Sequence, residues 1–165
     1  RAEWGAQGEA HGQMLNHSVV NHVLVFHTRG RRCEAFGDCS RVMRSLQKEY
    51  RGRNFSDVPH NFFISDAGET YEAQGWRLES EFQGLKERPT SLAVAFLGNY
   101  TSQTPKRHQL DEARAFINEA IRRGKLNRHF GVFVVRNSTE HVRDGQALID
   151  VLKYWPNWRQ VIEYS

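Results

Sequence analysis

Few residues in this chain have the type and spacing that catalysis requires. Ser40, Ser45 and Ser91 lie outside a Gly-x-Ser-x-Gly context, the sharp turn that exposes a serine nucleophile. His60 could donate to an oxyanion or shuttle a proton, but the sequence places no activated nucleophile beside it. A serine-hydrolase function therefore has no support, and a rearranged hydrolase built on His60 would lack a partner group.

The two cysteines, Cys33 and Cys39, are separated by five residues. This spacing fits a reduced pair, half of a metal site or a small disulfide loop. A zinc site needs further ligands, and the sequence has no Cys-x-x-Cys or His-x-x-x-His segment that would supply them. A disulfide is the favoured interpretation, and it predicts an oxidising compartment.

Four Asn-x-Ser/Thr sequons begin at Asn16, Asn54, Asn99 and Asn137. One sequon is easily accidental, but four in 165 residues indicate a secretory protein. The sequence has no segment long and apolar enough to cross a bilayer, and no signal peptide precedes Arg1. We expect an extracellular chain, either an excised ectodomain or a mature secreted form. Any membrane contact would be made through an anchor outside this chain.

The composition predicts one folded domain spanning residues 1–165. Ten Phe, five Tyr and four Trp supply large apolar side chains for a core. The net charge is +4 and the isoelectric point about 9.3, but 23 basic residues are interspersed with 19 acidic ones. No nucleic-acid partner is expected, because such proteins concentrate positive charge in a stripe with stacking aromatics. Arg29–Arg32 is the one compact basic cluster, and we interpret it as a solvated loop.

The elements that would position these residues alternate between strands and helices. Apolar runs predict buried strands at 19–26, 92–97 and 130–135, and a hairpin joins 62–64 to 70–72. Amphipathic patterns predict one helix from an N-cap at Asp38 to about residue 50, a second from Thr104-Pro105 to Gly124, and a third at about 146–154. This alternation predicts an α/β fold with a central mixed sheet flanked by three main helices.

Several segments, taken in order, resemble a peptidoglycan recognition protein, a family built on a zinc amidase framework. The segments are 1–6 (RAEWGA), 19–28, 57–64 (DVPHNFFI), 68–76, 91–100 (SLAVAFLGNY) and 145–158. Cys33 and Cys39 have the spacing of the internal disulfide of this family. The resemblance covers nearly the whole chain, and it implies a groove on one face where the family docks peptidoglycan stems.

Three positions in this resemblance bear on catalysis. Amidase members hold zinc with two His and one Cys, and this chain has Phe26, Val135 and Arg143 at those places. A benzyl ring, an isopropyl group and a guanidinium offer none of the donor atoms that zinc requires. His60 replaces the catalytic Tyr. The resemblance therefore implies no metal, no cofactor, no catalytic residue and no amidase activity.

The neighbours of these positions carry two further expectations. His27 follows the first lost ligand and, by strand alternation, is expected to be a packed and hydrogen-bonded histidine on the opposite face. Arg143 is expected to project toward the lost metal site and to pair with Asp144 or Glu140. The alternative for Arg143 is a solvent-exposed side chain on a loop.

The groove also departs from the family pattern. Phe82, in Ser80-Glu81-Phe82, and Gln74 replace groove residues of the family. Asn54 and Phe55 match a pair associated with lysine-type stems, and with His60 and Arg136 they are the residual groove candidates. A glycan on Asn54 would lie at the groove rim.

The chain is most similar to non-catalytic, receptor-type members of the insect long-form branch. This similarity implies a regulator that dampens peptidoglycan-triggered innate immune signalling through a heterodimer with a related receptor, and that binds peptidoglycan fragments weakly or not at all. The alternative is a pattern-recognition module that binds muropeptides directly through Asn54, Phe55 and Arg136.

Overall fold

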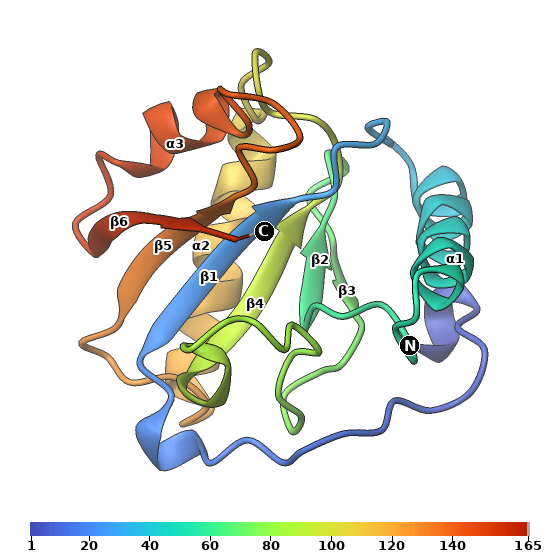
Figure 1. The fold of residues 1–165 in the computed structure, drawn as a ribbon, viewed down its shortest axis with the longest axis horizontal. Helices are drawn as coiled ribbons and strands as arrows, with labels where there is room; N and C mark the ends of the chain where they lie inside the picture. Colours follow the sequence, from blue (N-terminus) through green and yellow to red (C-terminus); the bar gives the residue numbers. More distant parts are fainter. Residues whose placement is uncertain (165) are drawn as a thin grey trace.

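The computed structural model describes residues 1–164, and its strands form one mixed sheet (Figure 1). The strands are β1 (His22–His27), β2 (Phe62–Ile64), β3 (Thr70–Glu72), β4 (Ser91–Phe96), β5 (Gly131–Arg136) and β6 (Trp158–Glu163). Their order across the sheet is β3-β2-β4-β1-β5-β6. The hairpin of β2 and β3 is antiparallel, and the other neighbours are parallel. The predicted α/β fold with a central mixed sheet is confirmed.

Three helices cover the two faces of this sheet. They are α1 (Phe36–Gly52), α2 (Arg107–Arg122) and α3 (Gln146–Leu152). Phe116 of α2 and Leu148 of α3 belong to one core cluster, and Met43 of α1 belongs to a second. Figure 1 shows α2 crossing behind the sheet and α1 standing on the other side, beside the N-terminal turn. The sheet therefore separates two cores.

Strand β1 contributes side chains to both cores in strict alternation. Val23 and Val25 lie in the core beneath α2 and α3, whereas Leu24 and Phe26 lie in the core beneath α1. A strand directs successive side chains to opposite faces. The sequence of β1 thus decides that Phe26 faces α1.

The end of α2 follows the expected glycine signal. Gly124 has a φ of +71°, and the N–H groups of Gly124 and Lys125 donate to the carbonyls of Ile121 and Ala120 at 3.0 and 2.9 Å. This pair of bonds is the Schellman arrangement, in which a left-handed residue satisfies the last carbonyls of a helix. Glycine adopts that conformation without steric cost.

Four boundary predictions are wrong. The second helix begins at Arg107, after an N-cap at Lys106, rather than at Thr104-Pro105. The first strand begins at His22 rather than at residue 19, because His17–Val19 forms a 3-10 turn that is capped by the side chain of Asn16. Asp38 is not an N-cap: α1 begins at Phe36, and Asp38 lies in its first turn. The third helix ends at Leu152 rather than near residue 154.

The sixth strand was not anticipated from the sequence. Strand β6 follows the turn at Pro156 and pairs with β5 through a register shift between Val132 and Phe133. Its exposure pattern is irregular, so the alternation that marks a strand is weak in its sequence. This strand brings Tyr164 to the site described next.

Candidate functional site

A cavity of about 320 Å³ opens on the α1 side of the sheet. Its walls come from the end of β1, the inner side of α1, the segment that precedes β2, the segment between β3 and β4, and the ends of β5 and β6. The apolar and aromatic lining side chains are Phe26, Leu46, Tyr50, Phe55, His60, Phe82, Val135 and Tyr164. The charged lining side chains are Arg29, Glu49, Arg53, Arg136 and Glu140.

Phe26 and Val135 occupy the cavity floor from neighbouring strands. Val25 and Val134 are register partners in the parallel pair β1–β5, so the residues that follow them lie side by side. The ring of Phe26 stacks on Phe82 with centroids 4.6 Å apart and an interplanar angle of 14°. Aromatic stacking and an isopropyl group make this floor apolar.

His60 is enclosed by aromatic rings. It is 2% exposed, and its ring centroid lies 4.7 Å from Phe26, 4.8 Å from Phe63 and 4.8 Å from Phe82. Nδ1 finds no hydrogen-bond partner among residues 1–164. Burial, with a smaller contribution from the Arg29 charge, lowers the pKa of His60 to about 3. The imidazole is therefore neutral at physiological pH.

His27 and Asp144 form a buried pair beside the cavity. His27 Nε2 donates to Asp144 Oδ1 at 2.7 Å, and His27 Nδ1 accepts the Tyr100 backbone N–H at 3.0 Å. Arg29 adds a bidentate contact to the same carboxylate at 2.9 and 2.6 Å. Burial opposes ionisation of Asp144, but the bonds from His27, Arg29 and the Asn137 N–H outweigh it and hold its pKa well below the usual range. The expectation of a packed, hydrogen-bonded His27 is confirmed.

The expected role of Arg143 is wrong. Its side chain is exposed, and among residues 1–164 no carboxylate lies within ion-pair distance of its guanidinium. Asp144, the expected partner, is already bonded to His27 and Arg29. Arg143 lies outside the residues that line the cavity. The alternative of a solvent-exposed loop residue describes it.

The cluster Arg29–Arg32 is only partly a solvated loop. Arg29 pairs with Asp144, Arg31 pairs with Asp38 at 2.7 and 3.0 Å, and Arg32 pairs with Asp66 at 2.6 and 3.0 Å. Asp144 and Asp66 are buried. The acids come from three different segments, so this basic run ties the end of β1 to the rest of the fold and its charge is largely neutralised.

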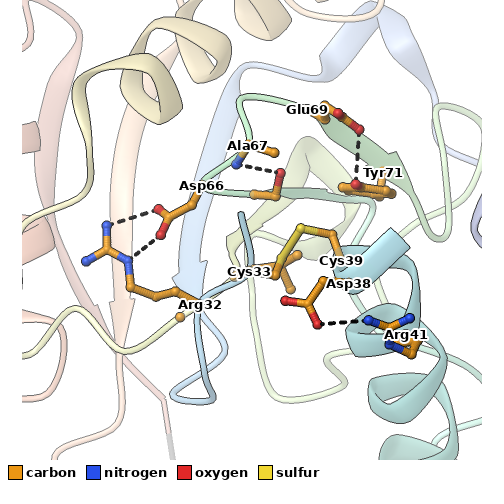
Figure 2. The surroundings of a disulfide bond; sticks show 12 residues. Arg32, Cys33, Asp38, Cys39, Arg41, Asp66, Ala67, Glu69 and Tyr71 are labelled. Atoms are coloured by element: carbon orange, nitrogen blue, oxygen red, sulfur yellow. Dashed lines mark hydrogen bonds and ion pairs between the residues drawn. A yellow bond between two sulfur atoms is a disulfide. The ribbon is translucent and has the colours of Figure 1, made fainter. Parts of the chain in front are cut away.

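The disulfide predicted for Cys33 and Cys39 is present. Their Cα atoms are 5.2 Å apart, and both side chains are buried. Figure 2 shows the bond at the start of α1, with the Arg32–Asp66 pair on one side and the Asp38–Arg41 pair on the other. The disulfide therefore links the end of the basic segment Arg29–Arg32 to the first turn of α1.

The residual groove candidates separate in the structure. Phe55, His60 and Arg136 line the cavity, whereas Asn54 lies outside its lining. Asn54 is exposed, with a φ of +69°, just beyond the end of α1. The sequon residue that does line the cavity is Asn137. Asn54 lies between Arg53 and Phe55, which both line the cavity, so a glycan on Asn54 at the groove rim stays a prediction.

The polar substitutions expected in the groove point elsewhere. Gln74 is buried and donates to the Val58 carbonyl at 3.1 Å and to Glu81 at 2.9 Å. Glu81 also accepts bonds from the Ser56 N–H and hydroxyl at 3.0 and 2.6 Å. Neither Gln74 nor Glu81 lines the cavity. Phe82 alone of the altered segment reaches it.

The side chains of this site do not fit zinc. Within residues 1–164 there is no group of three or more His, Cys, Asp or Glu side chains placed to hold a metal ion. Two imidazoles line the cavity: His60 is surrounded by phenyl rings, and His27 is bonded to Asp144. Zinc requires several nitrogen, sulfur or oxygen donors at once, and the side chains described at this site do not provide such a set.

Sequence reasoning missed several residues that line the cavity, among them Tyr164 and the pair of Glu49 and Arg53. Tyr164 arrives from the unanticipated β6, and its ring lies 5.5 Å from Phe82. The Glu49 and Arg53 pair comes from the last turns of α1 at 3.8 Å. The spacing of Glu49 and Arg53 was visible as an i, i+4 pair, but the direction in which it faces depends on how α1 packs.

The comparisons with known proteins agree with this fold. No family model matches the chain. Peptidoglycan recognition protein 1 of Bos indicus is 30% identical over 162 residues, which are 98% of this chain and 85% of that protein. The solved structure of human PGRP-IBETAC in complex with glycosamyl muramyl pentapeptide has a TM-score of 0.85 at 25% identity, over 96% of each chain.

A second solved structure holds two related ectodomains. It is tracheal cytotoxin bound to the ectodomain complex of PGRP-LCa and PGRP-LCx, with a TM-score of 0.86 at 23% identity over 96% of this chain and 95% of that one. Fold and sequence together define an innate-immunity recognition domain. The chain belongs to the peptidoglycan recognition protein family. Within residues 1–164, none of the helices is both long and apolar enough to span a bilayer.

Proposed function

We propose that this chain is a non-catalytic domain that dampens peptidoglycan-triggered immune signalling through contacts with another protein. The main observation in support of a non-catalytic domain is the apolar floor of the cavity, where Phe26 stacks on Phe82 and Val135 lies beside Phe26. A hydrolytic amidase of this family needs a metal and a proton donor at this place. Phenyl and isopropyl groups supply neither, and a buried neutral His60 has no activated partner.

The same residues support an impaired peptidoglycan groove. Phe82 fills space that the family leaves for small and imidazole groups, and Arg136 is already engaged. Its guanidinium donates to the Asp144 carbonyl at 2.9 Å and to Gln146 Oε1 at 2.5 Å. A ligand carboxylate would have to displace or share these bonds, which lowers the expected affinity.

The proposed partner is a related receptor of the same family, engaged as a heterodimer. The support is that tracheal cytotoxin is bound to an ectodomain complex of PGRP-LCa and PGRP-LCx in a solved structure. The buried disulfide and the four sequons support an extracellular location, as an ectodomain or a secreted chain. Mixing this chain with such a receptor and its ligand should give a complex in analytical ultracentrifugation. A chain that stays monomeric under all loading conditions would contradict the heterodimer.

Calorimetry with lysine-type and diaminopimelate-type muropeptides tests the impaired groove. We expect a Kd weaker than about 10 μM, which corresponds to roughly −7 kcal/mol. Tighter binding would favour direct recognition. Metal analysis of protein purified without chelators is the second measurement, and stoichiometric zinc with release of stem peptide would overturn the non-catalytic proposal.

The alternative function is direct capture of muropeptides, and one observation favours it. Phe55 and Arg136 both line the cavity. If capture occurs there, Phe55→Ala should weaken binding at least tenfold because it removes an aromatic wall. Phe36→Ala is the matched control, since Phe36 is 45% exposed and lies outside the cavity lining. Equal losses in both variants would argue against a ligand in this cavity.

A further inference from the structure

The outer side of α1 carries a second hollow, of about 610 Å³, with a strongly cationic lining. Its lining residues are Gly5, Gln7, Arg41, Arg44, Ser45, Gln47, Lys48 and Arg51. Four of these described residues are basic and none is acidic. This concentration is not apparent in the linear sequence, because the four basic residues are separated by apolar and neutral residues and by Glu49.

The helix gathers the four cations into one row. Arg41, Arg44, Lys48 and Arg51 follow each other at intervals of three, four and three residues, which places them on one side of a helix with 3.6 residues per turn. The row is about 15 Å long at 1.5 Å per residue. Leu46 and Tyr50 lie on the other side of α1 and line the cavity of the proposed function. The two sites are therefore separate.

Two of the guanidinium groups are held in place without losing their charge. Arg44 donates to the Trp4 carbonyl at 3.0 Å. Arg51 donates to the carbonyls of Ser56 and Gln7 at 3.1 and 2.7 Å. Neutral carbonyl groups fix the orientation of these side chains but do not cancel the positive charge, so the arrangement is preorganised for an anion.

The acids at the ends of the row neutralise it only in part. Arg41 lies 3.6 Å from Asp38, and Arg51 lies 3.7 Å from Asp57. Each of these acids has a closer partner: Asp38 binds Arg31 at 2.7 Å and Asp57 binds Arg1 at 2.5 Å. Within residues 1–164, Lys48 has no carboxylate within ion-pair distance. Net positive charge remains along the whole row.

We propose that this cationic row on α1 binds a sulfated polysaccharide. Arginine forks match the oxygens of a sulfate group bidentately, and a row of about 15 Å exceeds the reach of one small anion. A linear chain with repeated sulfates satisfies both observations. The disulfide and the sequons support an extracellular setting, in which sulfated glycans are the polyanions at hand.

Binding of a size-defined heparin octasaccharide, measured by calorimetry at several salt concentrations, tests this proposal. The double variant Arg41→Gln/Lys48→Gln should raise the Kd at least tenfold and reduce the magnitude of the log K against log salt slope by about two. The matched control is Arg107→Gln/Arg128→Gln, which removes the same charge from exposed positions elsewhere. The control should change the Kd less than twofold.

Three outcomes would overturn the proposal. They are the absence of heparin binding by the wild-type chain at 0.15 M salt, equal losses in the two double variants, and tighter binding of a phosphodiester polymer than of the octasaccharide. Thermal unfolding of each variant checks the fold, and Lys48→Gln alone replaces the double variant if that variant is unstable. Because α1 carries the two sites on opposite sides, muropeptide titrations report on the proposed function independently.

Discussion

The imidazole of His60 couples the stability of the protein to pH. Its pKa is about 3 in the folded chain, mainly because burial disfavours the charged ring, against an ordinary value of 6.5. Below pH 6.5 the unfolded chain therefore binds a proton that the folded chain does not bind. The contribution of His60 to the free energy of unfolding is therefore fully present above pH 6.5. It falls as the pH drops toward 3, by up to about 1.4 kcal/mol per pH unit.

We expect His60→Phe to remove this component of the pH dependence. Urea unfolding of the variant and the wild type between pH 4 and pH 8 should give free energies whose difference shifts steadily in favour of the variant below pH 6.5. His129→Phe is the control, because His129 is exposed. Parallel curves for His60→Phe and the wild type would show that His60 titrates normally.

Asp144 joins three segments through one buried carboxylate. Asp144→Asn removes the charge that Arg29 and His27 face, so we expect a loss of about 3 kcal/mol at pH 7. Because the folded pKa of Asp144 is depressed, its contribution is present above about pH 4 and declines at lower pH. The difference in the free energy of unfolding between the wild type and Asp144→Asn should therefore become smaller at acidic pH.

Asp150→Asn is the control for this prediction. Asp150 is exposed and pairs with Lys153 at 3.5 Å on the surface of α3, and such a pair contributes less than about 1 kcal/mol. Unfolding free energies of the two variants, measured side by side, should differ by about 2 kcal/mol. Equal effects would mean that the buried pair is no stronger than a surface pair.

At the scale of elements, the disulfide anchors the first turn of α1. We expect Cys33→Ser/Cys39→Ser to lower the free energy of unfolding by about 2 kcal/mol, because a closed loop of this length restricts the unfolded chain. Chemical denaturation gives the value, and wild-type protein in reducing buffer is the matched comparison. A change below about 0.5 kcal/mol in both samples would show that α1 docking is sufficient without the bridge.

At the scale of the whole molecule, we expect residues 1–165 to unfold as one domain. The two cores share the strands of a single sheet, so loss of one core exposes the other. Leu148 on one face of the sheet and Met43 on the other are both 0% exposed. Leu148→Ala and Met43→Ala should each lower the free energy of unfolding by about 2–5 kcal/mol, and each variant should still unfold in one transition. Calorimetry would contradict this if either variant showed two separate transitions.

Much of the fold was predictable because it rests on short-range patterns. The apolar run of β4, the stripe of α2 and the glycine at its end each express local physics, namely burial, helical period and the freedom of a left-handed glycine. The 3-10 turn at His17–Val19 and the strand β6 were missed. Their existence depends on capping by Asn16 and on pairing with β5, which are contacts that residue periodicity does not encode.

The candidate site was predictable in part. Phe26, Phe55, His60, Val135 and Arg136 do converge on one cavity. Arg143 does not reach it, because the carboxylate of Asp144 is turned inward to His27 and Arg29 while its neighbour is left exposed. The direction of a loop side chain depends on which partners are near it in the folded chain. The residues next to it in the sequence do not reveal that direction.

The sequence by itself determined which chemical groups this protein has: phenyl and isopropyl groups where zinc would need donors, two cysteines, and a run of basic residues at Arg29–Arg32. Only the tertiary structure decided what charge those groups present to solvent. Asp38, Asp66 and Asp144 neutralise the basic run, whereas the scattered cations of α1 are brought together at helical spacing. The physical reason is that a charge pairs with whatever lies near it in space, and folding sets those distances.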